Sequence, residues 1–136
     1  MKFIGFNFTK IHVERFSNKF KDLKINNKID ISTIEQIDQE SINKDEKIVK
    51  IKFTYDIVYN PKLAKINLSG EVFISDNINS VKNLLKEWEK NKQINEDFNI
   101  LLFNIILRKC NLKALELEDE MNLPLHMPFP SVKKGK

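Results

Sequence analysis

The hydrophobic period of this sequence changes once, close to residue 76. Before that point apolar residues alternate with polar ones, most cleanly over residues 28–32, and many of them are β-branched or aromatic. Such alternation is typical of half-buried strands. After that point apolar residues recur three and four positions apart, at Val81, Leu84, Leu85 and Trp88, which is typical of an amphipathic helix. The sequence therefore predicts an α+β fold in which the strands come first and the helices last.

Four strands are expected, over about residues 4–13, 28–32, 47–59 and 63–74. A turn signal centred on Pro61 joins the last two, so these strands should form a hairpin. The simplest arrangement of all four is an antiparallel meander. Gly70 interrupts the fourth pattern, which indicates either a bulge or the close approach of another backbone.

Two C-terminal helices should follow this sheet. The candidate N-caps are Asp76, Asn77 and Ser80 for the first helix and Asn95 for the second. The second helix should run over residues 96–115, and its first half, 98–107, is apolar nearly all round. A four-stranded sheet covers only one side of such a helix. Either the first helix or another copy of the chain should therefore cover the rest.

The length and composition suit one domain. The chain has 136 residues, of which 41% are hydrophobic, enough to build a single core. Three prolines between residues 123 and 130 predict an extended apolar segment, because proline this dense fits neither a helix nor an inner strand. We expect a single domain over residues 1–130, followed by a short basic tail over 131–136.

The N-terminal residues do not resemble a signal peptide, because Asn7, Thr9 and Lys10 interrupt their apolar run. The longest apolar stretch, residues 98–107, is shorter than the roughly 20 residues that cross a bilayer. A lone cysteine, Cys110, suits a reducing compartment. We expect a soluble cytoplasmic protein without membrane insertion.

Enzymatic and metal chemistry find little support in the sequence. Cys110 would need His12 or His126 as a base, and nothing in the sequence brings these residues together; His126 is expected at the surface or half-buried. The acidic residues near the end of the second helix lack the glycine of a calcium loop, and a solvated helix end explains them better: Glu116, Glu118, Asp119 and Glu120. We expect no catalytic residue, no metal and no cofactor, and a protein that is not an enzyme.

The third strand carries lysines among aromatic residues, with Lys50 and Lys52 beside Phe53 and Tyr55. This pattern could be a stacking platform for single-stranded nucleic acid, but a half-buried sheet with a solvated lysine face has the same pattern. The chain has only two arginines and a net charge of +4, which weakens the nucleic-acid interpretation. Nucleic-acid binding therefore stays as an alternative.

Several short strings, in order along the chain, resemble the SecB family of protein-export chaperones. They are residues 8–11, 28–32, 70–74, 99–103 with Arg108 and Cys110 beyond, and Met121, Asn122, Leu123 and Pro124. The resemblance implies an α+β protomer with a four-stranded antiparallel sheet and two C-terminal helices. It also implies a homotetramer built as a dimer of dimers, which binds unfolded preproteins in apolar grooves without nucleotide or catalysis.

The resemblance also implies which residues contact unfolded clients. By position these are Ile29 and Ile31 in the second strand, and Leu112, Leu115, Met121, Leu123 and Leu125 near and beyond the end of the last helix. Leu123 and Leu125 should share a face of the extended segment, because side chains two apart in an extended chain do so. Cys110 and the two histidines should be dispensable for client binding.

One feature of the charge distinguishes this chain from the family. SecB proteins are usually acidic and dock the SecA motor through an acidic surface, whereas this chain is basic; Glu71 stands near the matching place. SecB-like relatives also serve toxin–antitoxin systems, so a translocation component is one partner among several. Three functions therefore compete: a client-binding chaperone for export, folding or a toxin–antitoxin system, a nucleic-acid-binding module, and a structural oligomer without clients.

Overall fold

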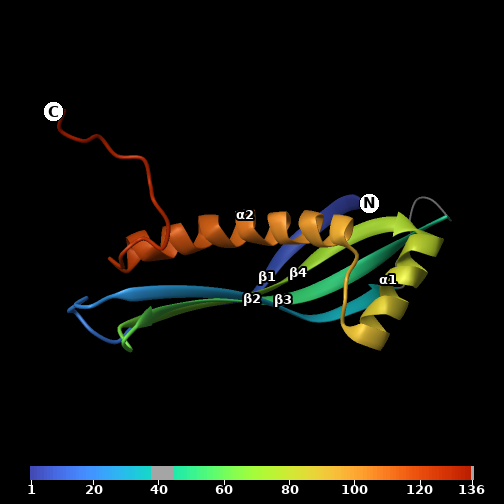
Figure 1. The fold of residues 1–136 in the computed structure, drawn as a ribbon, viewed down its shortest axis with the longest axis horizontal. Coiled ribbons are helices and arrows are strands. Elements are labelled where there is room, and N and C mark those ends of the chain that lie inside the picture. Colours follow the sequence, from blue (N-terminus) through green and yellow to red (C-terminus); the bar gives the residue numbers. More distant parts are fainter. Residues whose placement is uncertain (38–44, 136) are drawn as a thin grey trace.

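The computed structural model describes residues 1–37 and 45–135, so Lys136 of the expected basic tail lies outside the described residues. The elements are β1 (Lys2–Arg15), β2 (Lys24–Ile37), β3 (Glu46–Asn60), β4 (Ala64–Asn77), α1 (Ile78–Asn91) and α2 (Glu96–Glu120). The predicted order of strands and helices is confirmed (Figure 1).

The four strands form one antiparallel sheet in the order β1-β4-β3-β2. Strands β2, β3 and β4 form the expected meander, but β1 pairs with β4 at the far edge and not with β2. The connection over residues 16–23 is long enough to cross the end of the sheet, whereas a tight hairpin would keep β1 and β2 adjacent. The start of this connection is held beside the turn between β3 and β4, because the Phe16 amide donates to the Leu63 carbonyl oxygen over 2.8 Å.

The sheet has one apolar and one polar face. Every second residue of β3 is buried on the side of the helices: Val49, Ile51, Phe53, Tyr55, Ile57 and Tyr59. The opposite face is polar, and there the Lys50 ammonium lies 3.1 Å from Glu35 and 3.6 Å from Glu71. Both helices lie on the apolar face (Figure 1), so the core forms between them and the sheet.

A bulge in β2 keeps its isoleucines on the helix side. Ile31 pairs with Phe53 and Ile34 with Ile51, although three positions separate the two isoleucines. An extra residue, Ser32, lies between the two pairings and shifts the alternation by one. Without it Ile34 would point to solvent, because a one-residue shift turns every later side chain to the other face.

Gly70 is a position of close approach, as one of the two sequence alternatives predicted. A Cβ atom there would lie 2.6 Å from the Asn7 carbonyl oxygen and 2.8 Å from the Phe53 ring. The other alternative, a bulge, occurs in the neighbouring strand and not at Gly70. It lies in β1 between Phe8 and Lys10, next to the pairing of Phe8 with Gly70.

Asparagine caps begin both helices. The Ser80 amide donates to Asn77 Oδ1 over 2.8 Å, and the Phe98 amide donates to Asn95 Oδ1 over 2.9 Å. Helix α2 continues to Glu120, beyond the expected end near residue 115. The acidic residues therefore belong to the helix and do not follow it. Glu116, Asp119 and Glu120 are exposed, as expected of a solvated helix end, but the expectation is wrong for Glu118, whose side chain is fully buried.

Helix α2 is covered on its sheet side only. Its buried residues recur at helical spacing: Phe98, Leu102, Ile106, Cys110, Ala114 and Leu117. Ile100 and Leu112 on its outer side are 53% and 61% exposed. Helix α1 lies at one end of the sheet (Figure 1), and in the part of the chain that the structure describes these two side chains stay exposed.

Candidate peptide-binding groove

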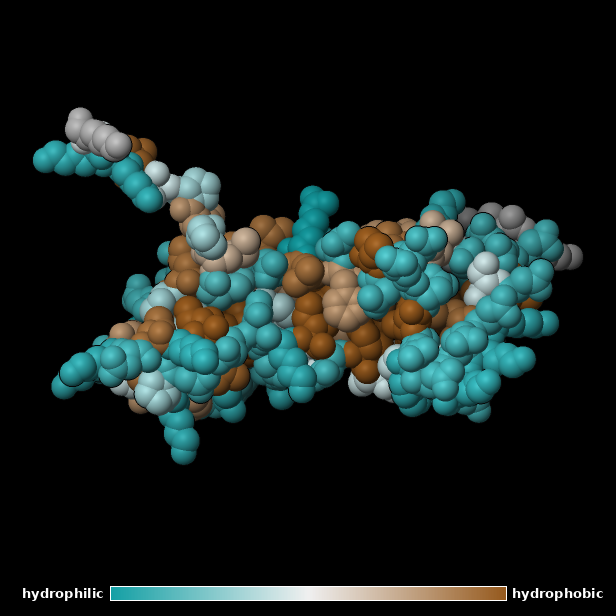
Figure 2. Space-filling model, in the orientation of Figure 1, coloured by the Kyte–Doolittle hydropathy of each residue, from teal (hydrophilic) through white to brown (hydrophobic). Residues whose placement is uncertain are grey.

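An apolar cavity of about 510 Å³ lies between β2 and the two helices. Its lining comes from β2, from the C-terminal end of α1 and the connection after it, and from α2: Ile31, Ser32, Trp88, Lys92, Ile94, Asn99 and Phe103. The Lys92 ammonium lies 5.1 Å from the centre of the Trp88 ring. Figure 2 shows apolar surface gathered between α2 and the strands beneath it, on the face that this view presents.

The space between β2 and α2 that contains this cavity is the groove, and one row of α2 side chains faces it. Residues four apart lie above one another on a helix, so Asn99, Phe103, Leu107 and Asn111 form a single row. Asn99 and Phe103 line the cavity, and two turns further on the Tyr55 hydroxyl donates to Asn111 Oδ1 over 2.7 Å. This row therefore leads from the cavity toward a polar cluster near the C-terminal end of α2.

The polar cluster surrounds the Glu118 carboxylate. The Tyr59 hydroxyl of β3 donates to Glu118 and also lies 2.9 Å from the Pro124 carbonyl oxygen. His126 Nδ1 lies 2.9 Å from Glu118 Oε1, and His126 Nε2 lies 3.0 Å from Asn111 Oδ1. The side chains of His126 and Glu118 are 3% and 0% exposed. The ring of His126 is therefore more enclosed than the sequence suggested.

The chain turns back at Asn122 to bring His126 to this cluster. Asn122 adopts a left-handed conformation with φ 52°, which asparagine tolerates better than most residues. The Leu123 amide donates to the Glu118 carbonyl oxygen over 2.8 Å. From the edge of the sheet opposite β2, Arg15 Nη1 of β1 donates to the Met121 carbonyl oxygen over 2.9 Å.

Six of the seven expected client contacts keep some exposure. Ile31 lines the cavity, and Leu112 and Leu125 are 61% and 42% exposed. The half-buried ones are Ile29, Leu115 and Met121. Leu123 is buried, at 6% exposed, so the expectation that Leu123 and Leu125 share one accessible face is wrong. The turn at Asn122 folds Leu123 into the core, and the strand alternation assumed for this segment does not apply.

Sequence reasoning missed three residues that the structure brings to Ile31. In the sequence Trp88 completes the apolar row of the first helix, Phe103 lies in the stretch that is apolar nearly all round, and Ile94 lies between the two expected helices. Trp88, Ile94 and Phe103 are all half-buried and line the same cavity as Ile31. Ile94 could have been recognised from the sequence, since an apolar residue in a short polar connection is unusual.

The thiol of Cys110 is a poor nucleophile in this structure. Burial raises its pKa to about 12, so the thiol is protonated at neutral pH. His12 lies elsewhere, in β1, with its Nε2 2.8 Å from Glu14 Oε1. Over residues 1–37 and 45–135 no three metal-ligating side chains group together.

The aromatic residues of the proposed nucleic-acid platform are inaccessible. Phe53 and Tyr55 are 1% and 0% exposed, because they face the helices, and Lys50 is paired with carboxylates on the opposite face. Stacking on bases needs an exposed ring. The expectation that these two rings form such a platform is therefore wrong.

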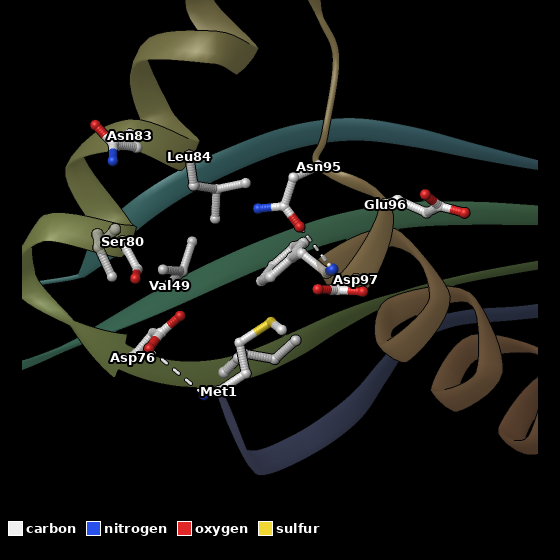
Figure 3. Close-up of a pocket in the computed structure, with 12 residues that line it drawn as sticks. Met1, Val49, Asp76, Ser80, Asn83, Leu84, Asn95, Glu96 and Asp97 are labelled. Atoms are coloured by element: carbon white, nitrogen blue, oxygen red, sulfur yellow. Dashed lines mark hydrogen bonds and ion pairs between the residues drawn. The ribbon is translucent and has the colours of Figure 1, made fainter.

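A second cavity, of about 370 Å³, lies where the two helices begin (Figure 3). Val49 and Leu84 contribute apolar side chains, but Asp76, Glu96 and Asp97 give it an acidic border. The N-terminal ammonium lies 3.4 Å from Asp76 Oδ1. An acidic border costs desolvation when an apolar chain binds, so this cavity is less suited to an unfolded polypeptide than the groove beside β2.

Neither helix of the described chain is both long and apolar enough to cross a membrane.

No protein-family model matches the sequence. No curated protein sequence matches it either. Among solved structures, the SecB-like chaperone Rv1957 of Mycobacterium tuberculosis, in complex with a ChAD peptide from the Rv1956 HigA1 antitoxin, is similar in fold. The alignment covers 99% of this chain and 92% of that one, with 9% sequence identity and a TM-score of 0.53. Together with the order of the strands and helices, this similarity shows that the chain has a SecB-like fold.

Proposed function

We propose that this protein is a chaperone that works without ATP and binds unfolded polypeptides in the groove between β2 and α2. The observation that carries the proposal is the cavity formed by Ile31, Trp88, Ile94 and Phe103 on a protein with a SecB-like fold. The structural neighbour holds an antitoxin peptide, which supports a polypeptide as the ligand.

The energetics suit reversible capture of many sequences. Burial of one large apolar side chain contributes about 1.5–3 kcal/mol, which alone is too weak to hold a chain. Contacts at Ile29, Ile31, Leu115 and Leu125 would add to this contribution, whereas Leu112, at 61% exposed, lies on the outer side of α2 away from the groove. Since apolar burial is not screened by ions, binding should depend only weakly on salt.

The proposal includes assembly with other copies of the chain. The outer side of α2 exposes Ile100 and Leu112, and a second copy would remove apolar surface there from water. A cytoplasmic homotetramer, arranged as a dimer of dimers, is the form that we propose.

Two cellular settings suit such a chaperone. The antitoxin peptide bound to the structural neighbour supports a role beside a toxin–antitoxin system. Delivery of preproteins to a translocation component is the second setting. It ranks second because the export motor docks on an acidic surface of SecB proteins, whereas this chain has a net charge of +4.

Fluorescence anisotropy with a reduced, alkylated model protein as client tests the proposal. We expect saturable binding that changes by less than about threefold when the salt concentration rises tenfold, because the driving force is apolar. A single-stranded oligonucleotide is the parallel ligand. Tight oligonucleotide binding that weakens steeply with salt, without client binding, would favour the nucleic-acid alternative instead.

A further inference from the structure

The segment after α2 is attached to the rest of the molecule by a buried carboxylate. Glu118 accepts hydrogen bonds from the His126 backbone amide over 3.2 Å and from the Tyr59 hydroxyl, and its carboxylate faces the His126 ring nitrogen Nδ1. Burying a carboxylate is costly unless it is paired and hydrogen-bonded. The contacts with His126 and Tyr59 offset that cost, and those with His126 exist only while the segment lies against α2.

The second nitrogen of the ring continues the connection toward β3. His126 Nε2 meets Asn111 Oδ1 at 3.0 Å, and the same oxygen accepts from the Tyr55 hydroxyl. Polar contacts thus join the C-terminal segment to α2, through Glu118 and Asn111, and to β3, through Tyr55 and Tyr59.

We propose that Glu118 and His126 are a positioning pair for client binding, and for His126 this replaces the sequence-based expectation that it is dispensable, because its ring is buried against Glu118. They hold residues 121–126 against α2 and so fix the position of the exposed Leu125, one of the proposed client contacts, although neither side chain of the pair is accessible to a client. This inference rests on the proposed function, because it assigns to the pair a role in that same groove.

The chain carries a matched control on its surface. His12 and Glu14 are the same two residue types at the same kind of distance, 2.8 Å between Nε2 and Oε1, but their side chains are 38% and 47% exposed. An exposed pair of this kind contributes little to stability. Replacing His12 should therefore reproduce the loss of a histidine without releasing any segment.

Hydrogen exchange of the whole chain tests the attachment without any client. In His126→Ala, the hydrogen-bonded amides of Asn122, Leu123 and residue 126 should exchange about tenfold faster or more, since a hydrogen bond to a charged group is lost. Amides of residues 98–114 in α2 should keep their rates. His12→Ala should match the wild type, and His126→Gln, whose side-chain amide can donate to Glu118, should lie between. Unchanged protection of these three amides in His126→Ala would overturn the attachment.

Client affinity tests the positioning role in the same proteins. His126→Ala should bind the unfolded model protein about tenfold more weakly, as expected for the loss of one apolar contact, with unchanged assembly and partial recovery in His126→Gln. If exchange accelerates while affinity stays at the wild-type value, the pair attaches the segment but does not position a client contact. If the wild type binds no client, the proposed function fails and the positioning role with it, whereas hydrogen exchange still decides the attachment.

Discussion

At the scale of single residues, Gly70 has the least space around it of the three glycines. Its Cα hydrogens face the Asn7 carbonyl oxygen and the Phe53 ring, where a Cβ would come within 2.6 and 2.8 Å. Both neighbours belong to paired strands and cannot easily move. Gly70→Ala should therefore lower the free energy of unfolding by about 1–3 kcal/mol, as overpacking does. Urea denaturation measures this.

Gly5 is the control for that substitution. It lies in the same sheet, in β1, but a Cβ there would meet no atom within 4 Å. Gly5→Ala should change stability by less than about 0.5 kcal/mol. Equal effects at both positions would show that the close approach at Gly70 has no energetic consequence.

Stability should also fall in alkaline solution. Burial raises the pKa of Cys110 to about 12 and raises that of Tyr55; it does the same for Tyr59, where the neighbouring carboxylate adds to the effect. The unfolded chain loses these protons from about pH 8.5 for cysteine and 10 for tyrosine. Above those values the folded state binds more protons than the unfolded state, so stability declines as pH rises.

Urea midpoints between about pH 7 and 11 measure this decline. Cys110→Ala removes the group that titrates first in the unfolded state, so its curve should be flatter than that of the wild type between about pH 8.5 and 10. Identical slopes for the two proteins would contradict the assigned burial of the thiol.

At the scale of elements, α2 depends on the cap at Asn95. Its side chain accepts from the Phe98 amide over 2.9 Å, and Glu96 and Asp97 follow in the first turn. Asn95→Ala should cost about 1 kcal/mol of stability, whereas Asn95→Asp should cost little because aspartate caps as well. Thermal unfolding followed by circular dichroism compares them. An alanine variant as stable as the aspartate variant would show that the cap is unimportant.

Elements whose signals are local were predictable from the sequence. The Asn95 cap, the turn at Pro61 and the apolar row from Val81 to Trp88 depend on neighbours a few positions away, and all were found as expected. The bulge at Ser32 was not predicted from the sequence. An extra residue in β2 is recognised only from the pairing of β2 with β3, and this pairing determines which face of β2 is buried. The place of β1 beside β4 likewise depends on a pairing across some sixty positions.

The candidate site likewise combines residues that a local pattern indicates with contacts between residues far apart in the sequence. Ile31 was assigned from a resemblance and lies in the groove, but the cavity also needs Trp88 and Phe103 from two helices. Glu118 looked like a solvated residue in an acidic run. Only Tyr59, far earlier in the chain, and His126, beyond the helix, make its burial favourable.

At the scale of the whole molecule, one chain leaves part of its longest helix uncovered. Ile100 and Leu112 are more than half exposed, and large exposed apolar patches mark interfaces. Light scattering at micromolar concentration should return the mass of four chains of 16.0 kDa each. A mass of a single chain would contradict the proposed assembly.

The central claim is that unfolded polypeptides bind in the groove between β2 and α2, and two arginine substitutions in β2 test it most directly. Ile31 points into the groove, opposite Phe53, whereas Thr33 pairs with Lys52 on the polar face and is exposed. The measurement is the affinity of Ile31→Arg and Thr33→Arg for the same unfolded model protein, at equal assembly. We expect Ile31→Arg to bind about tenfold more weakly or worse, since it removes apolar burial and adds a charge, and Thr33→Arg to stay within about twofold of the wild type because surface substitutions have small effects. Equal affinity of the two variants would contradict the groove as the binding site.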